Sequence, residues 1–397
     1  MYKAKESYSF LASLWELEEY CHLDDQRESF GSLPEMEGGF FIGETMLKEA
    51  FTFEKLLPCH KLCRASKQHR KDVINFELNL GYNLVKLSNE ILTKKYKVGS
   101  YKVFKIYEPK ERVIEALYYK DRLVLMAFCT HIIQPKLEKS LIYDNVACRK
   151  GKGTLFGLKR LEHFLRDYYK KYGCKGYFLK CDVTKYFQSI NHDILIKNLS
   201  KTSLDDEDLY MAKTIIDSKN AETGVGLPIG NQTSQWFGLF YLNKIDRLIK
   251  EKLRIKYYVR YMDDMILVHH DKEYLKYCRE QIEKVANNEL NLRLNSKTQV
   301  AQLKNGIDFL GFRTILCENG KILRLLRSQA KIKMKHKLKL LGKLKQEKIV
   351  DDDFINKRLN AYKGHLCHAN CNKVYYIYIK IKTSSNKIFL YRYCNNF

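Results

Sequence analysis

Two adjacent carboxylates, Asp263 and Asp264, interrupt the apolar sequence YYVRYMDDMILVHH at residues 257–270. The runs on either side are rich in β-forming residues, which predicts two strands of a hairpin with the carboxylate pair at its turn. A third carboxylate, Asp182, ends another predicted strand, GYFLKCDV, whose alternation places Lys180 and Asp182 on one face. If both elements belong to one sheet, the three carboxylates converge.

Three neighbouring carboxylates repel one another, and a divalent cation is their natural neutralising partner. Mg²⁺ prefers carboxylate oxygen. Two such ions about 3.5–4 Å apart can activate an attacking hydroxyl and stabilise a leaving phosphate. For an isolated Asp-Asp dipeptide the simpler interpretation is a polar hairpin turn, so the surrounding sequence has to decide between the two.

The composition favours a polyanionic partner. The 397 residues carry a net charge of +25, from 71 Lys and Arg against 46 Asp and Glu. This excess is too large for a typical metabolic enzyme and indicates nucleic acid. The 28 Tyr and 20 Phe can stack on bases while the cations follow the phosphates. The alternative is an AT-rich gene that favours Lys and Tyr codons.

The sequence predicts a cytoplasmic protein that does not span a membrane. No apolar run approaches the ~20 residues that a membrane span needs, and the N-terminal residues lack the apolar core of a secretory signal. The 12 Cys are therefore expected to be mostly reduced thiols.

The elements expected to position the carboxylates alternate between helices and strands. Apolar periodicity predicts helices over residues 60–98 and 114–138, and strict alternation predicts a strand over 99–109. Asn191 is a good N-cap for a helix after Asp182. Residues 326–348 form a strongly basic amphipathic helix pattern.

Six segments, quoted in chain order, occur with a recognisable spacing: KIYEPKERVIEALYYKDRLV, LKCDVTKYFQSINHDIL, GLPIGNQTSQWFGLFYLNKID, YMDD, LNLRLNSKTQV and GIDFLGFRT. In this order they resemble the finger and palm motifs of prokaryotic reverse transcriptases, over roughly residues 60–380. The resemblance implies an α+β right-hand polymerase with fingers, an antiparallel palm sheet carrying the carboxylate hairpin, and a helical thumb. We expect an acidic N-terminal extension (1–58), fingers and palm (59–316) and a basic helical thumb (317–397).

The resemblance implies RNA-directed DNA polymerase activity, with an RNA template, an RNA/DNA duplex and dNTPs as partners and two Mg²⁺ ions as cofactors, for which Mn²⁺ can substitute. Asp182, Asp263 and Asp264 match the metal-binding triad, with Asp182 and Asp263 as the ligands of both metals and the Val183 carbonyl as a further ligand.

The same resemblance assigns other roles along the chain. The residues expected around the incoming nucleotide are Lys110 and Arg112 at the triphosphate, Phe187 as the steric gate against a 2′-hydroxyl, Ile229, Gly230 and Gln235 near the nascent base pair, and Lys297 as a general acid to pyrophosphate. The expected primer grip consists of Phe309, Leu310 and Gly311. The expected contacts to nucleic acid are Arg149, Lys150 and Lys152 in the fingers and Lys331, Lys335 and Lys339 in the basic helix, for which a membrane-surface helix is the alternative.

The segment GLPIGNQTSQ resembles the enzymes of diversity-generating retroelements and related unknown-group and defence-associated enzymes, whereas most group II intron enzymes read roughly PQGG there. In the retroelement family, an apolar residue at the position of Ile229 is linked to error-prone copying of template adenines. The acidic residues 1–58, with twelve Asp and Glu against five Lys and Arg, depart from that pattern. They suit a defence system acting with a noncoding RNA, or a further partner such as a small basic accessory protein.

Two further hypotheses remain open from the sequence. A catalytically silent RNA-binding scaffold would share the fold, although the intact carboxylate triad argues against it. Two Cys/His clusters have some zinc-like spacing, with reduced structural Cys as the alternative interpretation. They consist of Cys59, His60, Cys63 and His69, and of His365, Cys367, His368 and Cys371.

Overall fold

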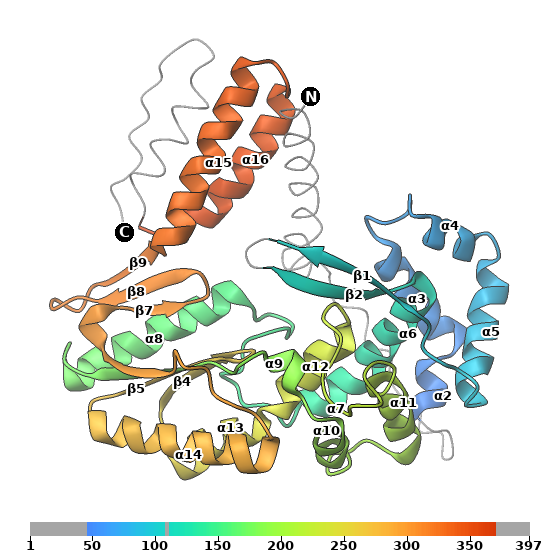
Figure 1. The fold of residues 1–397 in the computed structure, drawn as a ribbon, viewed down its shortest axis with the longest axis horizontal. Coiled ribbons are helices and arrows are strands. Elements are labelled where there is room, and N and C mark those ends of the chain that lie inside the picture. Colours follow the sequence, from blue (N-terminus) through green and yellow to red (C-terminus); the bar gives the residue numbers. More distant parts are fainter. Residues whose placement is uncertain (1–45, 108–110, 371–397) are drawn as a thin grey trace.

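A four-stranded antiparallel sheet, in the order β4-β5-β3-β6, lies at the centre of the protein in a computed structural model that describes residues 46–107 and 111–370 (Figure 1). Its strands are β3 (Tyr177–Cys181), β4 (Tyr257–Tyr261), β5 (Asp264–His269) and β6 (Gln299–Gln302). The hairpin predicted around the carboxylate pair is confirmed as β4 and β5, and the strand before Asp182 is confirmed as β3.

The sheet is buried on both faces. Leu179 and Met265 belong to a core on one face, whereas Phe178 and Ile266 belong to a second core on the other. This alternation places Lys180 and Asp264 on the side of Phe178, as successive side chains of a strand point to opposite faces. One sheet thus divides the apolar interior into two cores.

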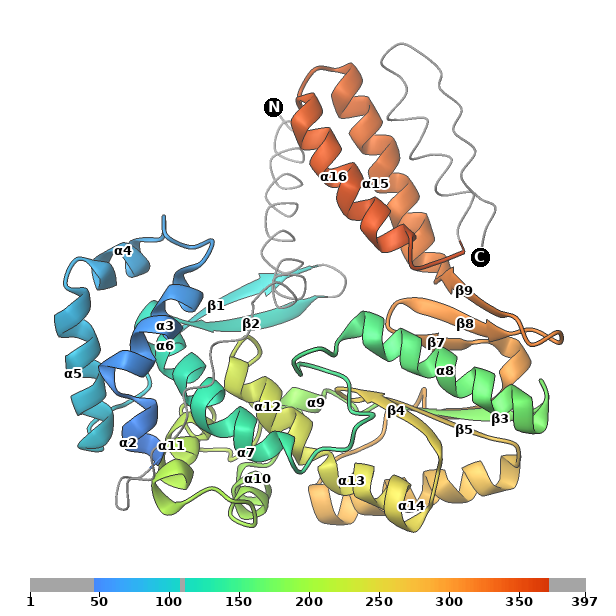
Figure 2. The ribbon, with the colours of Figure 1, turned by 180° about the vertical axis from the view of Figure 1, so that it is seen from behind.

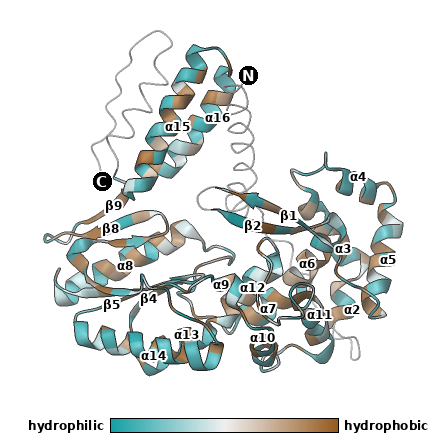
Figure 3. Ribbon diagram, viewed as in Figure 1, coloured by the Kyte–Doolittle hydropathy of each residue, from teal (hydrophilic) through white to brown (hydrophobic). Residues whose placement is uncertain are grey.

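Helices cover the two faces (Figures 1 and 2). Helix α14 (Lys272–Leu290) packs against β3 and β5 through buried residues at helical spacing, and its exposed surface is mostly hydrophilic in Figure 3. Asp271 caps its first turn by accepting hydrogen bonds from the backbone N–H groups of Glu273 and Tyr274. Helix α8 (Thr154–Tyr172) packs against β4.

A second sheet, β7-β8-β9, connects the central sheet to two long helices. Its strands are β7 (Ile307–Phe309), β8 (Phe312–Leu316) and β9 (Ile322–Leu326), and the helices are α15 (Ser328–Gln346) and α16 (Asp352–Leu366). Helix α15 confirms the basic helix predicted at 326–348. Strand β9 pairs with β8, so this sheet continues across residue 316, where the thumb was expected to begin.

The fingers consist of a helical group and one hairpin beside the palm (Figure 1). Their elements are α2 (Met46–Ala50), α3 (Phe53–Arg64), α4 (Lys71–Glu77), α5 (Leu80–Leu92), β1 (Tyr101–Ile106), β2 (Arg112–Leu117), α6 (Tyr119–Phe128), η1 (Cys129–Ile133) and α7 (Gln134–Glu138). The helix predicted over 114–138 is wrong for its first residues, because Ile114 and its neighbours pair with β1 as strand β2. Helix α3 continues across residue 58, where the N-terminal extension was expected to end.

Several short helices connect β3 to β4 along the chain. They are α9 (Tyr186–Ser189), α10 (His192–Leu199), α11 (Asp206–Ile216), α12 (Gln232–Tyr241), α13 (Asn243–Arg247) and η2 (Leu248–Lys252), with η3 (Leu303–Asn305) following β6. Asn191 is confirmed as the N-cap of α10, since its side chain accepts a hydrogen bond from Ile194 N–H. In the described ranges no helix combines the length and apolar character that crossing a membrane requires. Residues 1–45, Lys110 and Cys371 lie outside the described residues.

Candidate active site

The tight turn of the β4–β5 hairpin and the end of β3 bring the three carboxylates together. Tyr261 pairs with Asp264, so the turn contains only Met262 and Asp263. Strand β3 is antiparallel to β5, and the pairing of Cys181 with Met265 places Asp182 beside Asp264. Asp182 and the Asp263–Asp264 pair, some eighty residues apart in the sequence, therefore lie at the same end of the sheet, as the sequence predicted.

The electrostatics of the carboxylates indicate negative charge in excess. Burial and the neighbouring Asp182 raise the pKa of Asp263 to about 7. Burial also raises the pKa of Asp264, and the nearby Lys180 ammonium partly offsets this effect. Among the described residues, Asp264 therefore has a cation of its own, whereas Asp263 does not.

Lys180 is a charged partner that the sequence motifs did not assign to the site. Its Nζ lies 2.9 Å from Oδ1 of Asp264 and donates a hydrogen bond to Oδ2 at 3.1 Å. The same ammonium donates to the carbonyl oxygen of Asp308 in β7 at 2.6 Å. Its position two residues before Asp182, on the same face of a strand, was the signal that could have identified it.

A loop after α14 supports Asp182 and Val183. Asn295 N–H donates to the carbonyl oxygen of Asp182 at 2.7 Å, and its side-chain amide lies 3.4 Å from Oδ2 of the same residue. Thr184 N–H donates to the carbonyl of Arg293 at 3.0 Å. These two backbone bonds flank Val183, whose own carbonyl takes part in neither. Asn295 was not identified from the sequence.

A buried ion pair lies directly behind the turn of the β4–β5 hairpin. Arg260 and Asp246 have fully buried side chains, and Arg260 Nε donates to Oδ1 of Asp246 at 2.7 Å. The guanidinium also donates to the carbonyl of Met262 at 2.9 Å and to that of Leu239 in α12 at 3.0 Å. Met262 has φ +52°, a left-handed conformation uncommon for non-glycine residues. The ion pair thus anchors the strained residue that precedes Asp263.

The donor set fits divalent cations of the Mg²⁺ type. The carboxylates are hard oxygen ligands, and burial together with the neighbouring Asp182 raises the pKa of Asp263, so a divalent cation would stabilise its charged form. The register brings the three carboxylates to the same end of the sheet, but among the described residues no group of three or more His, Cys, Asp or Glu is placed to hold a metal ion as it stands. Two of the three carboxylates, Asp182 and Asp263, are close enough to affect each other, while Asp264 is engaged by Lys180.

The expected nucleotide-binding residues lie on the finger side of the triad. Arg112 is exposed at the start of β2, beside Lys110, which lies outside the described residues. Phe187, on α9, is half-buried, and its ring packs against Gly238 of α12, where a Cβ in place of the glycine hydrogen would lie 3.3 Å from the ring. Gln235 is half-buried in the first turn of α12, and its Oε1 accepts a hydrogen bond from Cys148 Sγ at 3.4 Å.

The loop that carries Ile229 and Gly230 is attached to the fingers. Glu115 N–H in β2 donates to the carbonyl oxygen of Ile229 at 3.0 Å. Gly230 has φ +128°, and a Cβ there would lie 3.3 Å from the carbonyl oxygen of Glu115. The glycine therefore lets the loop backbone approach strand β2 closely. The sequence had suggested a different reason for the glycine, namely a close approach to the nascent base pair.

The expected primer grip forms the turn between β7 and β8. Phe309 pairs with Phe312, and the two turn residues Leu310 and Gly311 have φ +49° and +83°, as a two-residue hairpin requires. Phe309 is buried, and Leu310 packs on Gly157 of α8. These two side chains therefore hold the turn in place. Lys297 is exposed in the loop that begins at Asn295.

The basic residues of the fingers differ in their surroundings. Arg149 donates from Nε to Glu138 at 3.1 Å and from Nη1 to two backbone carbonyls, so its side chain shapes the loop. Lys150 is exposed. The Nζ of Lys152 lies 4.2 Å from the ring centroid of Tyr143, and burial together with Arg149 lowers its pKa to about 8.

The basic residues of α15 form one stripe. Lys331, Lys335 and Lys339 recur every four residues beside the buried Met334 and Leu338, so they lie along one side of the helix.

The first Cys/His cluster is part of the finger core. His60 Nδ1 contacts Tyr119 Oη at 2.8 Å, and His60 Nε2 lies 3.2 Å from Glu77. Burial raises the pKa of Cys59 to about 12, and its Sγ lies 3.4 Å from His131 Nε2. In the second cluster, Cys367 Sγ donates to the carbonyl of Gly364. These contacts favour reduced structural thiols, and no zinc-like cage converges within the described ranges.

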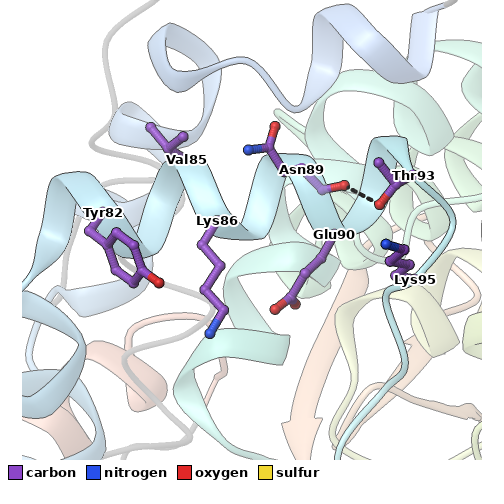
Figure 4. Close-up of a pocket in the computed structure, with 7 residues that line it drawn as sticks. All are labelled: Tyr82, Val85, Lys86, Asn89, Glu90, Thr93 and Lys95. Carbon is purple, nitrogen blue, oxygen red and sulfur yellow. Dashed lines mark hydrogen bonds between the residues drawn. The ribbon is translucent and has the colours of Figure 1, made fainter.

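A surface hollow of about 370 Å³ lies on α5, on the outer side of the fingers (Figure 4). Its lining residues are Tyr82, Val85, Lys86, Asn89, Glu90, Thr93 and Lys95. It is remote from the carboxylates, and we assign it no part in their chemistry.

Two solved structures are similar to this chain at low sequence identity. The chain has 16% identity and a TM-score of 0.47 to a telomerase from Candida albicans solved with a TWJ fragment of telomeric RNA, over 62% of this chain and 49% of that one. An apo telomerase from Candida tropicalis, truncated from its C-terminal domain, has 17% sequence identity to this chain and a TM-score of 0.45. The match covers 60% of this chain and 59% of that one. The chain thus spans about half to three fifths of these proteins. A search of curated proteins finds no match.

The profile of the family described as reverse transcriptase (RNA-dependent DNA polymerase) matches residues 94–314, more than half of the chain. This segment contains β3, the β4–β5 hairpin and all three carboxylates. The mixed helical and antiparallel architecture described above is the right-hand polymerase fold expected for such a domain. The chain belongs to the reverse transcriptase family.

Proposed function

We propose that this protein is an RNA-directed DNA polymerase that extends a primer on an RNA template by nucleotidyl transfer. The observation that carries the proposal is that the strand register brings Asp182, Asp263 and Asp264 to the same end of one sheet. The family membership of residues 94–314 supports the same reaction class.

Different residues of the site would serve different parts of the reaction. Asp182 and Asp263 would hold two Mg²⁺ ions, with the Val183 carbonyl as a further ligand. Bound there, the ions would supply activation of the primer 3′-hydroxyl and neutralisation of the departing pyrophosphate. The hydroxyl gives up its proton to solvent, and its oxygen forms a bond to the α-phosphorus as the bond to pyrophosphate breaks. Lys297 would supply the proton that pyrophosphate takes up.

Other side chains would select and orient the substrates. Lys110 and Arg112 would hold the triphosphate, because cations offset the charge that develops on phosphate oxygens. Phe187 would exclude a 2′-hydroxyl, so dNTPs would be the substrates. Lys150 and Lys152 would contact the template strand.

The thumb and the primer grip would hold the duplex. Lys331, Lys335 and Lys339 would contact duplex phosphates, which makes binding strongly dependent on salt. Phe309, Leu310 and Gly311 would place the primer terminus through the backbone of the β7–β8 turn.

Primer extension on a defined RNA template tests this function. The wild-type protein, with Mg²⁺ and dNTPs, should synthesise DNA, and Asp263→Asn, which keeps the size of the side chain, should not. The variant should still bind the primed template, which separates lost chemistry from lost binding. Template binding without DNA synthesis by the wild type, under any primer or divalent metal, would instead favour a silent RNA-binding scaffold.

We further propose the role of an error-prone prokaryotic enzyme of a diversity-generating retroelement, working in the bacterial cytoplasm. Ile229 supports this role: its carbonyl is bonded to β2 and its half-buried apolar side chain offers no hydrogen bond to a base or sugar. A gap-filling assay on templates rich in adenine should show frequent misincorporation, and Ile229→Gln should lower it. An unchanged adenine error rate would remove the support for this role.

A defence enzyme acting with a noncoding RNA is the second candidate, favoured by the acidic composition of residues 1–58. Copurified nucleic acid distinguishes the two. One abundant structured RNA, bound by the full chain and lost on deletion of the acidic residues, would favour defence over the retroelement role.

A further inference from the structure

Lys180 lies between the carboxylates and the primer-grip hairpin. It is in the centre of the palm sheet, with Ile266 opposite on β5 and Gln299 opposite on β6. Its Nζ contacts both carboxylate oxygens of Asp264, at 2.9 and 3.1 Å, and the carbonyl oxygen of Asp308 at 2.6 Å. Two of these contacts are hydrogen bonds, to Asp264 Oδ2 and to the Asp308 carbonyl, whereas Asp264 Oδ1 lies at ion-pair distance and accepts no hydrogen bond among the described residues.

This contact makes the three carboxylates unequal. Asp264 has a cation within hydrogen-bonding distance, and its side chain and that of Lys180 are only 27% and 23% exposed. A divalent cation that used the same oxygens of Asp264 would have to displace the ammonium or lie beside a like charge. Asp182 and Asp263 have no comparable cation among their described contacts, so the attraction for metal is concentrated on them.

The other contact of Lys180 reaches the second sheet. Asp308 lies in β7, directly before Phe309 and the turn expected to grip the primer. The Asp308 side chain accepts from Arg313 Nε at 2.8 Å and lies 3.6 Å from Arg327, while its carbonyl accepts from Lys180. One ammonium thus joins the catalytic hairpin of the first sheet to the β7–β8 hairpin of the second.

We propose that Lys180 is a positioning residue, the resident counter-ion of Asp264, which leaves Asp182 and Asp263 as the principal metal ligands and fixes the primer-grip turn relative to them. The inference rests on the nucleotidyl-transfer function proposed above. It assigns Asp264 the role of holding Lys180 in place rather than that of an equal third ligand.

Metal affinity without nucleic acid tests the counter-ion role. Tb³⁺ luminescence, with competition by Mg²⁺, would be measured for the full chain and for Lys180→Met, Lys180→Arg and Lys175→Met. Removing the ammonium next to Asp264 should tighten Mg²⁺ binding about three- to tenfold, since one positive charge leaves a half-solvated site. Lys180→Arg should stay within about twofold of wild type. Lys175→Met removes an exposed charge that precedes β3 and lies roughly 17 Å from Lys180 along the extended chain. Its Mg²⁺ affinity should also stay within about twofold of wild type.

A second comparison keeps the proposal testable if Lys180→Met fails to fold. With Lys180 present, Asp264→Asn should weaken Mg²⁺ binding less than Asp263→Asn does. Equal or greater weakening by Asp264→Asn would overturn the counter-ion role. So would unchanged or weaker Mg²⁺ binding by a folded Lys180→Met protein.

Primer extension tests the link to the second sheet. Lys180→Met should raise KM for the primed template about tenfold more than KM for dNTP, and Lys180→Arg should recover part of this loss. A KM for primed template equal to that of wild type would overturn the link. Because Tb³⁺ binding needs no DNA synthesis, an inactive wild-type protein would refute the proposed function without deciding the role of Lys180.

Discussion

Replacing Arg260 by methionine should destabilise the protein by about 3–5 kcal/mol, because it leaves the Asp246 carboxylate charged and unpaired in the core. Both side chains are 0% exposed, so solvent cannot compensate the lost partner. The carbonyls of Met262 and Leu239 would also lose their hydrogen-bond donor. Typical domains have only about 5–15 kcal/mol of net stability, so the effect should be large.

Urea unfolding at low temperature, followed by fluorescence, measures this loss. Trp236 is buried in α12, beside the carbonyl that Arg260 binds, and reports on this core. The matched control is Arg247→Met, which removes an exposed arginine that pairs with Glu251 one helical turn away and donates a hydrogen bond to the Ser140 carbonyl at 2.8 Å. That pair should contribute about 0.3–0.5 kcal/mol.

A double variant, Arg260→Met with Asp246→Leu, separates stability from positioning. Removing both charges should recover most of the lost stability, since a buried ion pair is often no more stabilising than apolar residues of similar volume. The Met262 carbonyl would still lack its donor. We therefore expect the double variant to fold yet to extend primers with a reduced kcat and little change in KM for dNTP.

Two results would refute this reasoning. A loss for Arg260→Met as small as that for Arg247→Met would show that the buried pair is not desolvated in solution. A double variant less stable than either single variant would show that the ion pair itself, and not the unpaired charge, dominates the energetics.

Three further predictions concern the site and its support. In the absence of divalent metal, Asp263→Asn should become more stable than wild type as pH rises from about 4 to 8, by about 1–3 kcal/mol. The reason is that the folded-state pKa of Asp263, about 7, lies above the ordinary value of 3.8, so the wild-type protein loses stability as pH rises through this window. Mg²⁺ at pH 8 should remove most of the difference, and thermal unfolding across pH checks both points. Phe187→Ala should raise ribonucleotide incorporation relative to dNTP about tenfold or more, by removing a steric clash, as single-nucleotide extension would measure; equal discrimination would refute the gate. Asn191→Ala should cost about 1 kcal/mol in urea unfolding, because Ile194 N–H loses its cap, and no change in the urea midpoint would contradict this.

The palm could be predicted from the sequence because its signals are local. The alternation in β3, the apolar runs around Asp263 and the cap at Asn191 each specify their own element. Strand β2 could not be found in this way, because the helical periodicity of residues 114–138 continues through it. Only pairing with β1, a contact made elsewhere in the chain, decides that Ile114 lies in a strand.

The supporting residues of the site were hidden for a similar reason. Lys180 and Arg260 look like ordinary charges in strand sequences, and their roles depend on partners that are distant along the chain. Lys180 reaches Asp308, and Arg260 reaches Leu239 and Asp246. Sequence motifs identify groups that would touch the substrate more readily than the residues that hold those groups in place.

The bond between Glu115 N–H and the Ile229 carbonyl joins the finger hairpin to the loop that we propose lies beside the nascent base pair. Gly230 keeps this contact close, because any side chain there would press against strand β2. The finger strand and the loop therefore move as one body. In the proposed polymerase, the residues that bind the dNTP and the loop that faces the base pair would belong to this body. A substitution that changes how tightly the fingers close on a dNTP should then also change how often the wrong base is accepted.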